Sequence, residues 1–337
     1  MRLVVQIPCY NEEDTIARVV ADIPRVIVGV DEVLVLIVDD GSTDATVAVA
    51  LASGADCVAR HVQNRGLAAA FRTGLDAAVR LGADIVVNTD GDHQYRGEDI
   101  PQLVEPILRG KADLVVGDRD AAAAPHFSPA KRLLQSFGSR VVRQLSGTAV
   151  PDAPSGFRAF SREAALRLNV VTSYSYTLET LIQAGAQRFA VTSIPITARR
   201  TERKSRLAHG TFDYVLRSVI TLIRAYAMYQ PIRFFIASAL ALVIPGLIGA
   251  LRFAWFYAQG GGSGHLQSLV LSGVLIVIGF QVGVIGVVAD LIAANRRLVE
   301  ESLYRLRRLD ARREQNWPDE AAPVGSDSEE SRSVHHG

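Results

Sequence analysis

Cysteine is scarce in this chain of 337 residues, which contains only Cys9 and Cys57. Two cysteines do not build the disulfide framework of a small secreted domain, and we expect no disulfide because a cytoplasmic domain keeps its thiols reduced. The N-terminal segment Met1–Val5 also lacks the charged, apolar and cleavage regions of a secretory signal, so we expect none. These absences favour a globular part that folds in the cytoplasm.

Several chemistries lack their residue patterns here. No Cys/His ligand spacing surrounds His61 or His93, which argues against a zinc site. The chain has no Gly-rich loop ending in Gly-Lys-Ser/Thr and no arrangement for Ser-His-Asp catalysis. The net charge of +1 points to no particular partner, and we predict no nucleic-acid partner. A metal bound by oxygen ligands would be Mg²⁺ or Mn²⁺.

Apolar residues, by contrast, are abundant and make up 49% of the chain. Two long stretches, Phe234–Leu251 and Ser268–Ala289, contain no charged residue. Each is close to the roughly 20 residues that a helix needs to cross the hydrocarbon core of a bilayer. We therefore predict two transmembrane helices. The alternative is a pair of helices buried in a large soluble core.

Charged residues flank both stretches in an ordered way. Arg233 precedes the first and a group of arginines follows the second, so the positive-inside rule places both outer ends in the cytoplasm. The segment 259–265 is then a short external loop, beside which Arg252 can snorkel among aromatic residues. Gly279 and Gly283 have the spacing for close helix packing, within one chain or between chains of a homo-oligomer. The arginines after the second stretch are Arg296, Arg297, Arg305, Arg307 and Arg308.

Residues 1 to about 200 alternate β-rich and helical runs, which is typical of a largely parallel sheet covered on both faces. We predict a helix over Asn11–Ala21, capped by Asn11 and favoured by acidic residues in its first turn. A second helix is predicted over Thr43–Ala52, and a third over Leu67–Leu81, which ends at Gly82 in the left-handed position of a C-cap. The predicted strands are Leu3–Ile7, Val33–Val38, Ile85–Asn88, Leu114–Gly117, Gly156–Phe160 and Phe189–Ile194.

Polar motifs follow three of these strands, at the edge where open α/β sheets bind ligands. Ile7-Pro8-Cys9-Tyr10-Asn11-Glu12-Glu13 closes the first strand, and Ile37-Val38-Asp39-Asp40-Gly41-Ser42-Thr43-Asp44 closes the second, where an aspartate can accept hydrogens of a base or ribose. Asn88-Thr89-Asp90-Gly91-Asp92-His93-Gln94 carries two carboxylates able to share one divalent cation, which neutralises a substrate diphosphate. Each of the first two motifs alone also fits a capped strand-to-helix turn.

In this order, together with Asn64-Arg65-Gly66-Leu67, the motifs resemble those of glycosyltransferase family 2. These are inverting enzymes with a nucleotide-diphospho-sugar transferase fold (α/β, GT-A, Rossmann-like), and the resemblance covers residues 1 to about 210. It implies that a nucleotide-diphospho-sugar donor is bound by residues of these motifs. Those residues are Pro8, Tyr10, Asn11, Glu12, Asp39, Asp40, Asn64, Gly66 and Asp90.

Within that family the chain is similar to the dolichol-phosphate mannose synthase-like polyprenyl-phosphate glycosyltransferases. The similarity is carried by Asp92-His93-Gln94, Gly117-Asp118-Arg119, Asp152–Arg158 and Arg200–Leu207. It implies a Mg²⁺ or Mn²⁺ ion held by Asp92, Gln94 and Asp90. It also implies that the acceptor phosphate is bound by Arg119, Arg200, Ser205 and Arg206, and that Asp92, Asp152 and Arg119 are catalytic.

The last of these segments departs from the family's Arg-x-x-Gly-x-Ser-Lys-Leu loop, with Arg203 in place of glycine and Arg206 in place of lysine. Its positive charge is kept, and a lipid phosphate has to be held against a donor diphosphate of the same sign. A run of cations before a membrane segment is also common as a solvated face or as a patch for anionic lipid. Both interpretations stay open from the residues alone.

The resemblance also implies a mechanism with little need for a general base. A polyprenyl monophosphate is already anionic near neutral pH, so a carboxylate such as Asp152, or alternatively Glu179, orients or assists the nucleophile. Glu179 also fits a cap or an ion pair with an arginine. In-line attack at the anomeric carbon inverts its configuration, and the metal stabilises charge on the leaving nucleoside diphosphate.

We therefore predict a membrane-anchored hexosyltransferase that transfers a sugar to undecaprenyl or dolichyl phosphate at the cytoplasmic membrane face. The predicted parts are a GT-A domain over 1–210, a juxtamembrane amphipathic helix over 211–231, transmembrane helices over 232–258 and 266–293, and a cytoplasmic basic helix with a disordered tail over 294–337. The amphipathic segment also fits a helix packed on the globular domain. The alternatives are a processive polysaccharide synthase of the same family, whose Gln-x-x-Arg-Trp motif is missing, and a catalytically silent membrane scaffold.

Overall fold

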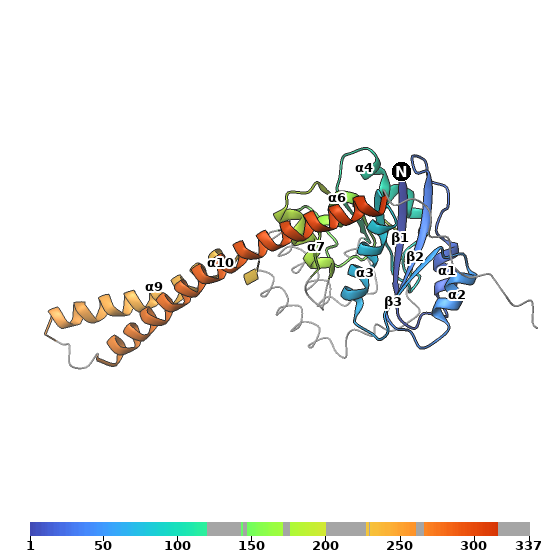
Figure 1. Cartoon of the computed structure of the whole chain (residues 1–337). Helices are drawn as coiled ribbons and strands as arrows, with labels where there is room; N and C mark the ends of the chain where they lie inside the picture. The colour runs from blue at the N-terminus through green and yellow to red at the C-terminus, as the bar shows by residue number, and fades with distance from the viewer. Residues whose placement is uncertain are drawn as a thin grey trace, which may run out of the picture.

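A single mixed sheet organises the N-terminal part of the chain in the computed structural model (Figure 1), which describes residues 1–119, 143, 147–170, 176–199, 227–228, 230–260 and 266–315. The strand order is β3-β2-β1-β4-β6-β5-β7. Pairs between these strands are parallel except where β6 is involved. The strands are β1 (Arg2–Cys9), β2 (Glu32–Asp39), β3 (Cys57–Arg60), β4 (Ile85–Asn88), β5 (Leu114–Asp118), β6 (Arg158–Ser161) and β7 (Val191–Pro195). The predicted α/β class is confirmed.

Helices cover both faces of the sheet and create two apolar layers. One layer lies under α1 (Ile16–Ala21), α2 (Thr46–Ala52) and α4 (Ile100–Leu108), which follows the short 3₁₀ turn η1 (Gly97–Asp99). The other lies under α3 (Leu67–Arg80), α6 (Arg162–Arg167) and α7 (Tyr176–Ala186). Phe71 of α3 meets Phe160 of β6 edge-on, with ring centroids 5.8 Å apart. The strands read as continuous apolar runs because both of their faces are buried.

The first helix begins later than its sequence predicts. Asn11 is not its cap: α1 starts at Ile16, and Asn11 has a positive φ of 52° in the preceding loop. The acidic residues after Asn11 therefore belong to a loop that reaches towards β2 rather than to a helical turn. Gly82 follows the C-terminal end of α3 with a φ of 80°, so the predicted left-handed C-cap is confirmed.

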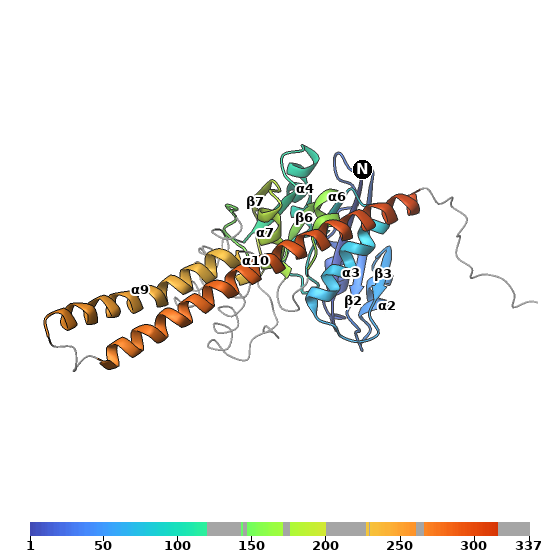
Figure 2. The same cartoon turned by 60° about the vertical axis from the view of Figure 1, so that its left-hand side comes forward.

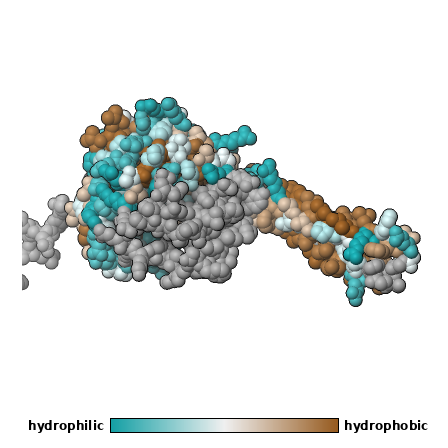
Figure 3. All heavy atoms as spheres, turned by 180° about the vertical axis from the view of Figure 1, so that it is seen from behind, coloured by the Kyte–Doolittle hydropathy of each residue, from teal (hydrophilic) through white to brown (hydrophobic). Residues whose placement is uncertain are grey.

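Two long helices, α9 (Pro231–Ala258) and α10 (Leu266–Gln315), form an arm that projects from the sheet domain (Figures 1 and 2). Both are long and apolar enough to cross a membrane. Most of their apolar side chains are exposed, and Figure 3 shows the arm as a largely hydrophobic surface. The alternative of two helices buried in a soluble core is therefore wrong. Arg252 lies over the Phe256 ring at 5.6 Å, beside the aromatic residues expected at this end.

Glycines of α10 bring the two helices of the arm together. A Cβ at Gly279 would lie 2.5 Å from Val243 Cγ2, and one at Gly286 would lie 2.6 Å from Phe235 Cβ. At Gly283 the nearest atom is Ala239 Cβ, at an ordinary 3.8 Å. The small-residue face predicted from the sequence is thus used between α9 and α10 of one chain.

Several sequence predictions fall outside the described residues. They are Arg200, Ser205 and Arg206 of the basic segment, most of the amphipathic helix over 211–231, and the tail beyond 315. The basic segment after the second apolar stretch is described, and it continues α10 without a break to Gln315.

Candidate active site

The polar motifs gather at one edge of the sheet. The parallel strands β1, β2, β4 and β5 end there, and the antiparallel β6 begins there, since Arg158 pairs with both Asn88 and Val116. Parallel strands deliver their carboxyl ends to a common edge, which is the usual ligand site of this architecture. The sequence prediction that these motifs come together is confirmed by this topology.

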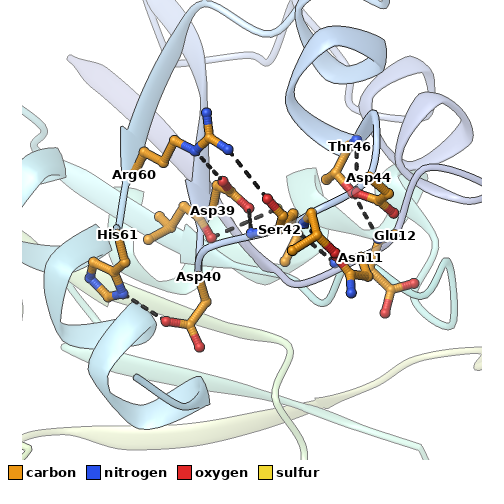
Figure 4. Close-up of polar contacts among 12 residues, drawn as sticks. Asn11, Glu12, Asp39, Asp40, Ser42, Asp44, Thr46, Arg60 and His61 are labelled. Atoms are coloured by element: carbon orange, nitrogen blue, oxygen red, sulfur yellow. Dashed lines mark hydrogen bonds and ion pairs between the residues drawn. The ribbon is translucent and has the colours of Figure 1, made fainter. Parts of the chain in front are cut away.

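The loop after β1 is tied to the loop after β2 (Figure 4). Asn11 N–H donates to Ser42 Oγ at 3.0 Å, and Thr43 N–H donates back to Asn11 Oδ1 at 2.9 Å. Glu12 N–H donates to Thr46 Oγ1 at 2.8 Å. The left-handed backbone at Asn11 makes these bonds possible, and Asn is one of the few residues that tolerate that conformation. The two loops form one hydrogen-bonded wall.

Asp39 ends β2 and is fully buried. Its Oδ1 accepts from Ser42 N–H at 2.9 Å, while Arg60 Nε lies 3.0 Å from Oδ2. Oδ2 nevertheless has no hydrogen bond of good geometry within the described structure. An under-satisfied buried carboxylate oxygen beside a half-exposed guanidinium is a suitable acceptor for a base or ribose donor. The position of Asp39 fits the role predicted for it.

Asp40 serves the next loop instead. Its Oδ1 accepts from Arg65 N–H at 2.9 Å, and its Oδ2 from Gly66 N–H at 2.8 Å. His61 Nδ1 lies 2.7 Å from Oδ1, and since a carboxylate only accepts, this nitrogen donates. Both oxygens are thus occupied by the turn that carries Asn64 and Gly66. Asp40 holds the predicted donor-binding loop in place, and direct contact with the donor stays a prediction.

Gly41 lets the turn that carries Asn64 and Gly66 pack directly against the loop after β2. Its φ is 78°, and a Cβ there would be 2.6 Å from the carbonyl carbon of Gln63 and 2.8 Å from Asn64 N. Any larger residue needs the backbone at 63–64 to move. Glycine at this point is required by close backbone approach as well as by its positive φ.

The Asp90-Gly91-Asp92 loop follows β4 and contacts the wall at Gly91. Thr15 Oγ1 donates to Gly91 O at 2.7 Å, and a Cβ at Gly91 would lie 3.3 Å from Cys9 Cβ. Asp92 Oδ1 accepts from Gln94 N–H at 3.0 Å, which closes a tight turn through His93, whose φ is 60°. The two aspartates are thereby fixed beside the end of β1.

Burial changes the pKa of both aspartates in this loop. Desolvation and the neighbouring charge of Asp92 raise the pKa of Asp90 to about 7. Desolvation also raises the pKa of Asp92, against the opposing effect of the Gln94 backbone hydrogen bond. Two neighbouring carboxylates in a partly buried place are unfavourable in their charged form unless a bound cation neutralises them.

A divalent cation fits these residues when substrate phosphates complete its ligands. No cluster of three or more His, Cys, Asp or Glu side chains able to hold a metal occurs among the described residues. Mg²⁺ usually takes only one or two carboxylates and fills its other positions with water and phosphate oxygens. Asp90 and Asp92 match that pattern, with Gln94 on the same turn.

Arg119 and Asp152 form a bidentate ion pair at the end of β5. Arg119 Nε donates to Asp152 Oδ2 at 2.7 Å, and Nη2 donates to Oδ1 at 3.0 Å. Asp152 is only 2% exposed, so this carboxylate is neutralised in a nearly dry environment. Burial alone would lower the pKa of Arg119, but its hydrogen bonds to Asp152 raise that pKa above the ordinary value. The general-base role predicted for Asp152 stays a prediction, and its contacts fit a residue that orients Arg119.

The floor of the site depends on polar residues that the sequence analysis did not single out. Asn88 Nδ2 donates to Gly156 O at 2.8 Å and to Tyr176 Oη at 3.1 Å, and its Oδ1 accepts from Gln6 Nε2 at 2.8 Å. Tyr95 Oη accepts from Gly156 N–H at 3.0 Å. A Cβ at Gly156 would be 2.9 Å from Asp90 Oδ2, so this glycine lies directly against the Asp90 carboxylate.

Arg158 supports this floor from inside the domain. It is fully buried, and its guanidinium donates to backbone oxygens of Ala153, Ser155 and Thr177 and to Thr180 Oγ1, at 2.6–2.8 Å. Desolvation lowers its pKa to about 10. Arg158 thus joins the 153–155 segment next to Asp152 with the start of α7.

Arg199 joins the exit of the sheet to the loop over residues 90–94, which is named the metal loop after the metal ligands predicted in it. Its N–H donates to Gln94 O at 2.8 Å, and its guanidinium contacts both Asp22 and His93. His93 Nε2 lies 2.9 Å from Asp22 Oδ2. The basic segment predicted to bind the acceptor phosphate therefore starts beside the predicted metal ligands.

The remaining predicted residues occupy different places. Pro8 and Tyr10 flank the end of β1; a Cβ at Gly91 would lie 3.5 Å from Pro8 O, and Tyr10 is 36% exposed. Asn64 is exposed on the turn held by Asp40. Glu179, the alternative to Asp152, lies in α7 and contacts Gln183 and Arg296. An ion-pair role, which the sequence left open, matches this position.

Comparisons with known proteins agree with this geometry. Residues 4–168 match the family model for glycosyl transferase family 2. Polyprenol monophosphomannose synthase of Mycolicibacterium smegmatis is 34% identical over 215 residues, which cover 60% of this chain and 78% of the relative. Glycosyltransferase AglJ of Haloferax volcanii is 29% identical over 314 residues, or 90% of this chain and 96% of the relative.

A solved structure shares the fold. It is glucosyl-3-phosphoglycerate synthase of Mycobacterium tuberculosis with Mn²⁺, UDP-glucose and glycerol 3-phosphate, with a TM-score of 0.52 and 27% identity over 67% of this chain and 79% of that one. The family match and the shared fold define a nucleotide-sugar glycosyltransferase of the GT-A fold. The chain belongs to glycosyltransferase family 2.

Proposed function

We propose that this protein transfers a hexose from a nucleotide-diphospho-sugar to a polyprenyl phosphate, with inversion, at the cytoplasmic face of a membrane. The observation that carries the proposal is the presence in one chain of a GT-A fold and of two helices long enough to span a bilayer. A membrane anchor keeps the active site beside a water-insoluble acceptor, and a soluble acceptor gives no such reason for an anchor.

The donor is held along the wall formed by the loops after β1 and β2. Asp39 accepts hydrogens of the base or ribose, and the turn at Asn64 and Gly66, fixed by Asp40, closes over the nucleotide. Asp90, Asp92 and Gln94 are the residues that would hold Mg²⁺ or Mn²⁺. The ion supplies Lewis-acid stabilisation of the charge that develops on the departing nucleoside diphosphate.

The acceptor phosphate lies at Arg119 in this proposal. The guanidinium has five N–H donors, and its side-chain bonds to Asp152 use Nε and Nη2, so other donors are directed to the phosphate. Asp152 keeps Arg119 oriented and limits its net charge. Because a phosphate monoester carries most of its charge above a second pKa of about 6, the nucleophile needs no strong base.

Names of relatives support the acceptor class. They include the polyprenol monophosphomannose synthase above, a UDP-N-acetylglucosamine–dolichyl-phosphate N-acetylglucosaminyltransferase of Methanococcus voltae, which is 31% identical over 226 residues, and an undecaprenyl-phosphate mannosyltransferase of Micrococcus luteus. These relatives share the polyprenyl phosphate and differ in the sugar. We therefore propose the acceptor class and leave the sugar to experiment.

A donor-panel assay tests the proposal. Purified protein in detergent is incubated with polyprenyl phosphate, Mn²⁺ or Mg²⁺, and each of several radiolabelled nucleotide sugars, and label extracted into organic solvent is counted. Metal-dependent label from one donor establishes the transferase and identifies its sugar. Tight nucleotide binding without lipid product from any donor would contradict the proposal and favour another acceptor, a polymer product or a silent scaffold.

A further inference from the structure

The second membrane-length helix does not stop where its apolar stretch ends. α10 continues past Ala289 to Gln315, and its charged half lies across α3 and α6 of the catalytic domain (Figure 2). Its less exposed positions include Arg296, Glu300, Leu303, Tyr304 and Arg307, which recur with the spacing of one helix face. This face is the docking face of α10.

Tyr304 is the centre of the docking face. It is only 6% exposed and belongs to the apolar layer under α3 and α6. Its hydroxyl contacts both carboxylate oxygens of Glu163, at 3.0 and 3.2 Å, and Arg167 lies over its ring at 4.2 Å. Glu163 and Arg167 also form an ion pair along α6, with 2.6 Å between Oε1 and Nε. A tyrosine held by its ring and by its hydroxyl fixes both position and rotation of the helix.

Arg307 adds a second attachment one turn further along. Its Nη2 lies 3.1 Å from Asp76 Oδ1 of α3, and its Nη1 donates to Leu168 O at 3.1 Å, beyond the end of α6. The side chain is 19% exposed, so these contacts are made in a partly dry place. They attach α10 to two different helices of the catalytic domain, which prevents rotation about Tyr304.

A third attachment lies nearer the membrane and leads to the active site. Arg296 Nη2 is 3.9 Å from Glu179 Oε1 on α7, and Arg296 Nε bonds Glu300 Oε1 at 2.7 Å. α7 begins at Tyr176, whose hydroxyl accepts from Asn88 in the floor of the site. One continuous helix thus contains the membrane-length apolar stretch and, through Glu179, contacts α7, whose first residue supports the floor of the site.

We propose that the docking face of α10 makes this helix a strut that sets the distance and orientation of the active site relative to the bilayer, with Tyr304 and Arg307 as positioning residues. At about 1.5 Å per residue, Tyr304 lies roughly 22 Å along the helix from Ala289. The acceptor phosphate stays at the bilayer surface, so the height and tilt of the site decide whether Arg119 reaches it. This inference rests on the proposed function.

Assays with two different acceptors distinguish an effect on the position of the active site from an effect on catalysis. Full-length protein is reconstituted into liposomes that contain long-chain polyprenyl phosphate, and the same preparation is assayed with a water-soluble short-chain prenyl phosphate. Tyr304→Ala is expected to raise KM for the bilayer acceptor by roughly tenfold or more, since small misplacements of reacting groups are costly. The kcat with the soluble acceptor and KM for the donor stay unchanged.

Matched variants sharpen the test. Tyr304→Phe keeps the ring and is expected to retain most of the bilayer activity, while Arg307→Ala behaves like Tyr304→Ala. Arg305→Ala changes an exposed arginine one position from Tyr304, 73% exposed, and is the control. The strut is contradicted if Tyr304→Ala matches Arg305→Ala in liposomes, or if it impairs both acceptors equally.

Hydrogen exchange tests the docking without reference to turnover. Amides of α6 and of α10 around Tyr304 are expected to exchange faster in Tyr304→Ala than in Arg305→Ala. Unchanged exchange would overturn the docking itself. Wild-type protein that exchanges as expected but glycosylates neither acceptor would refute the proposed function, and with it the catalytic role of the strut, while the docking stands.

Discussion

The two halves of the ligand edge hold their carboxylates in opposite ways. On the side predicted to bind the donor, Asp39 accepts a hydrogen bond from Ser42 N–H of its own loop, and Asp40 accepts hydrogen bonds from the N–H groups of Arg65 and Gly66 in the loop after β3. On the side predicted to bind the metal, Asp90 and Asp92 lie in a partly buried turn, where desolvation raises the pKa of both carboxyls. Desolvation raises the pKa of Asp44 but hydrogen bonds from Thr46 bring it below its usual range, whereas desolvation and Asp92 raise the pKa of Asp90 to about 7.

This difference indicates that one pair of carboxylates stabilises the loops, while the other pair takes part in the reaction. Carboxylates satisfied by the backbone fix loops in one conformation before any ligand arrives. Neighbouring carboxylates with raised pKa values are stabilised by a bound cation. In the proposed reaction this cation enters together with the donor diphosphate. The comparison predicts that changes on the metal side impair catalysis with little effect on folding, and that changes on the donor side impair folding first.

The largest effect on transfer is expected from Asp92→Asn. The change removes a metal-ligand charge while keeping the shape of the side chain, and loss of one electrostatic contact to a developing anion typically costs about 10²–10³ in rate. The thermal unfolding temperature and the membrane-bound fraction stay close to those of the wild type. Asp14→Asn, an exposed residue of the loop after β1, is the matched control. Transfer by Asp92→Asn at the wild-type rate would remove this loop from the mechanism.

The Arg119–Asp152 pair distinguishes orientation from base catalysis. Arg119→Ala is expected to lower transfer by roughly 10- to 100-fold, as hydrogen bonds to charged groups contribute about 1.5–3 kcal/mol. Asp152→Asn keeps the shape and one acceptor oxygen, so it should lower transfer less. The measurement is kcat for each variant across a range of pH.

A general base at Asp152 gives the opposite order. In that case Asp152→Asn would lose more activity than Arg119→Ala and would remove the acidic limb of the pH profile. The orienting role predicts an acidic limb that is retained in Asp152→Asn.

On the donor side, Gly41→Ala is expected to destabilise folding. Its Cβ would meet the Gln63 carbonyl carbon at 2.6 Å, in addition to the strain of a positive φ. We expect a loss of about 2–3 kcal/mol in the free energy of unfolding. Gly110→Ala is the matched control, because it has a φ of 65° and no atom within 4 Å of the new Cβ. Equal losses in the two variants would show that the loop contact at Gly41 is unimportant.

The smallest effect concerns the arm. A Cβ at Gly279 would lie 2.5 Å from Val243 Cγ2, so Gly279→Val adds methyl groups at a contact that is already too close. A Cβ at Gly273 of the same helix meets no atom within 4 Å. We expect Gly279→Val to reduce stability in detergent by about 1–2 kcal/mol relative to Gly273→Val. Thermal unfolding measures the difference. The reverse order would indicate that Gly273 packs against a second chain.

Much of the fold was predictable from local pattern. The buried strands read as apolar runs, the uncharged stretches indicate α9 and α10, and Gly82 marks the end of α3. The edge strand β3 (Cys57–Arg60) was missed because it is short and only half buried. The start of α1 was misplaced because the acidic residues after Asn11 fit a first helical turn equally well.

The site was predictable as a set of motifs but not as a set of contacts. Arg119 and Asp152 are separated by 33 residues, so their pairing depends on the fold. Gln6 and Asn88 interrupt buried apolar strands, and such polar residues inside a strand could have been recognised as supports of the site. The sequence also indicates that α10 continues beyond the apolar stretch, because Arg296–Glu300 and Glu301–Arg305 are i,i+4 pairs that favour a helix.

The most direct test of the central claim varies the acceptor at a fixed donor. Wild-type protein in detergent receives the donor identified by the panel, with Mn²⁺ or with a chelator, and either polyprenyl phosphate or the corresponding polyprenol. We predict a lipid-extractable product only with the phosphate and only with the metal. Product from the polyprenol, or product from the phosphate that is unaffected by the chelator, would contradict metal-dependent transfer to a lipid phosphate.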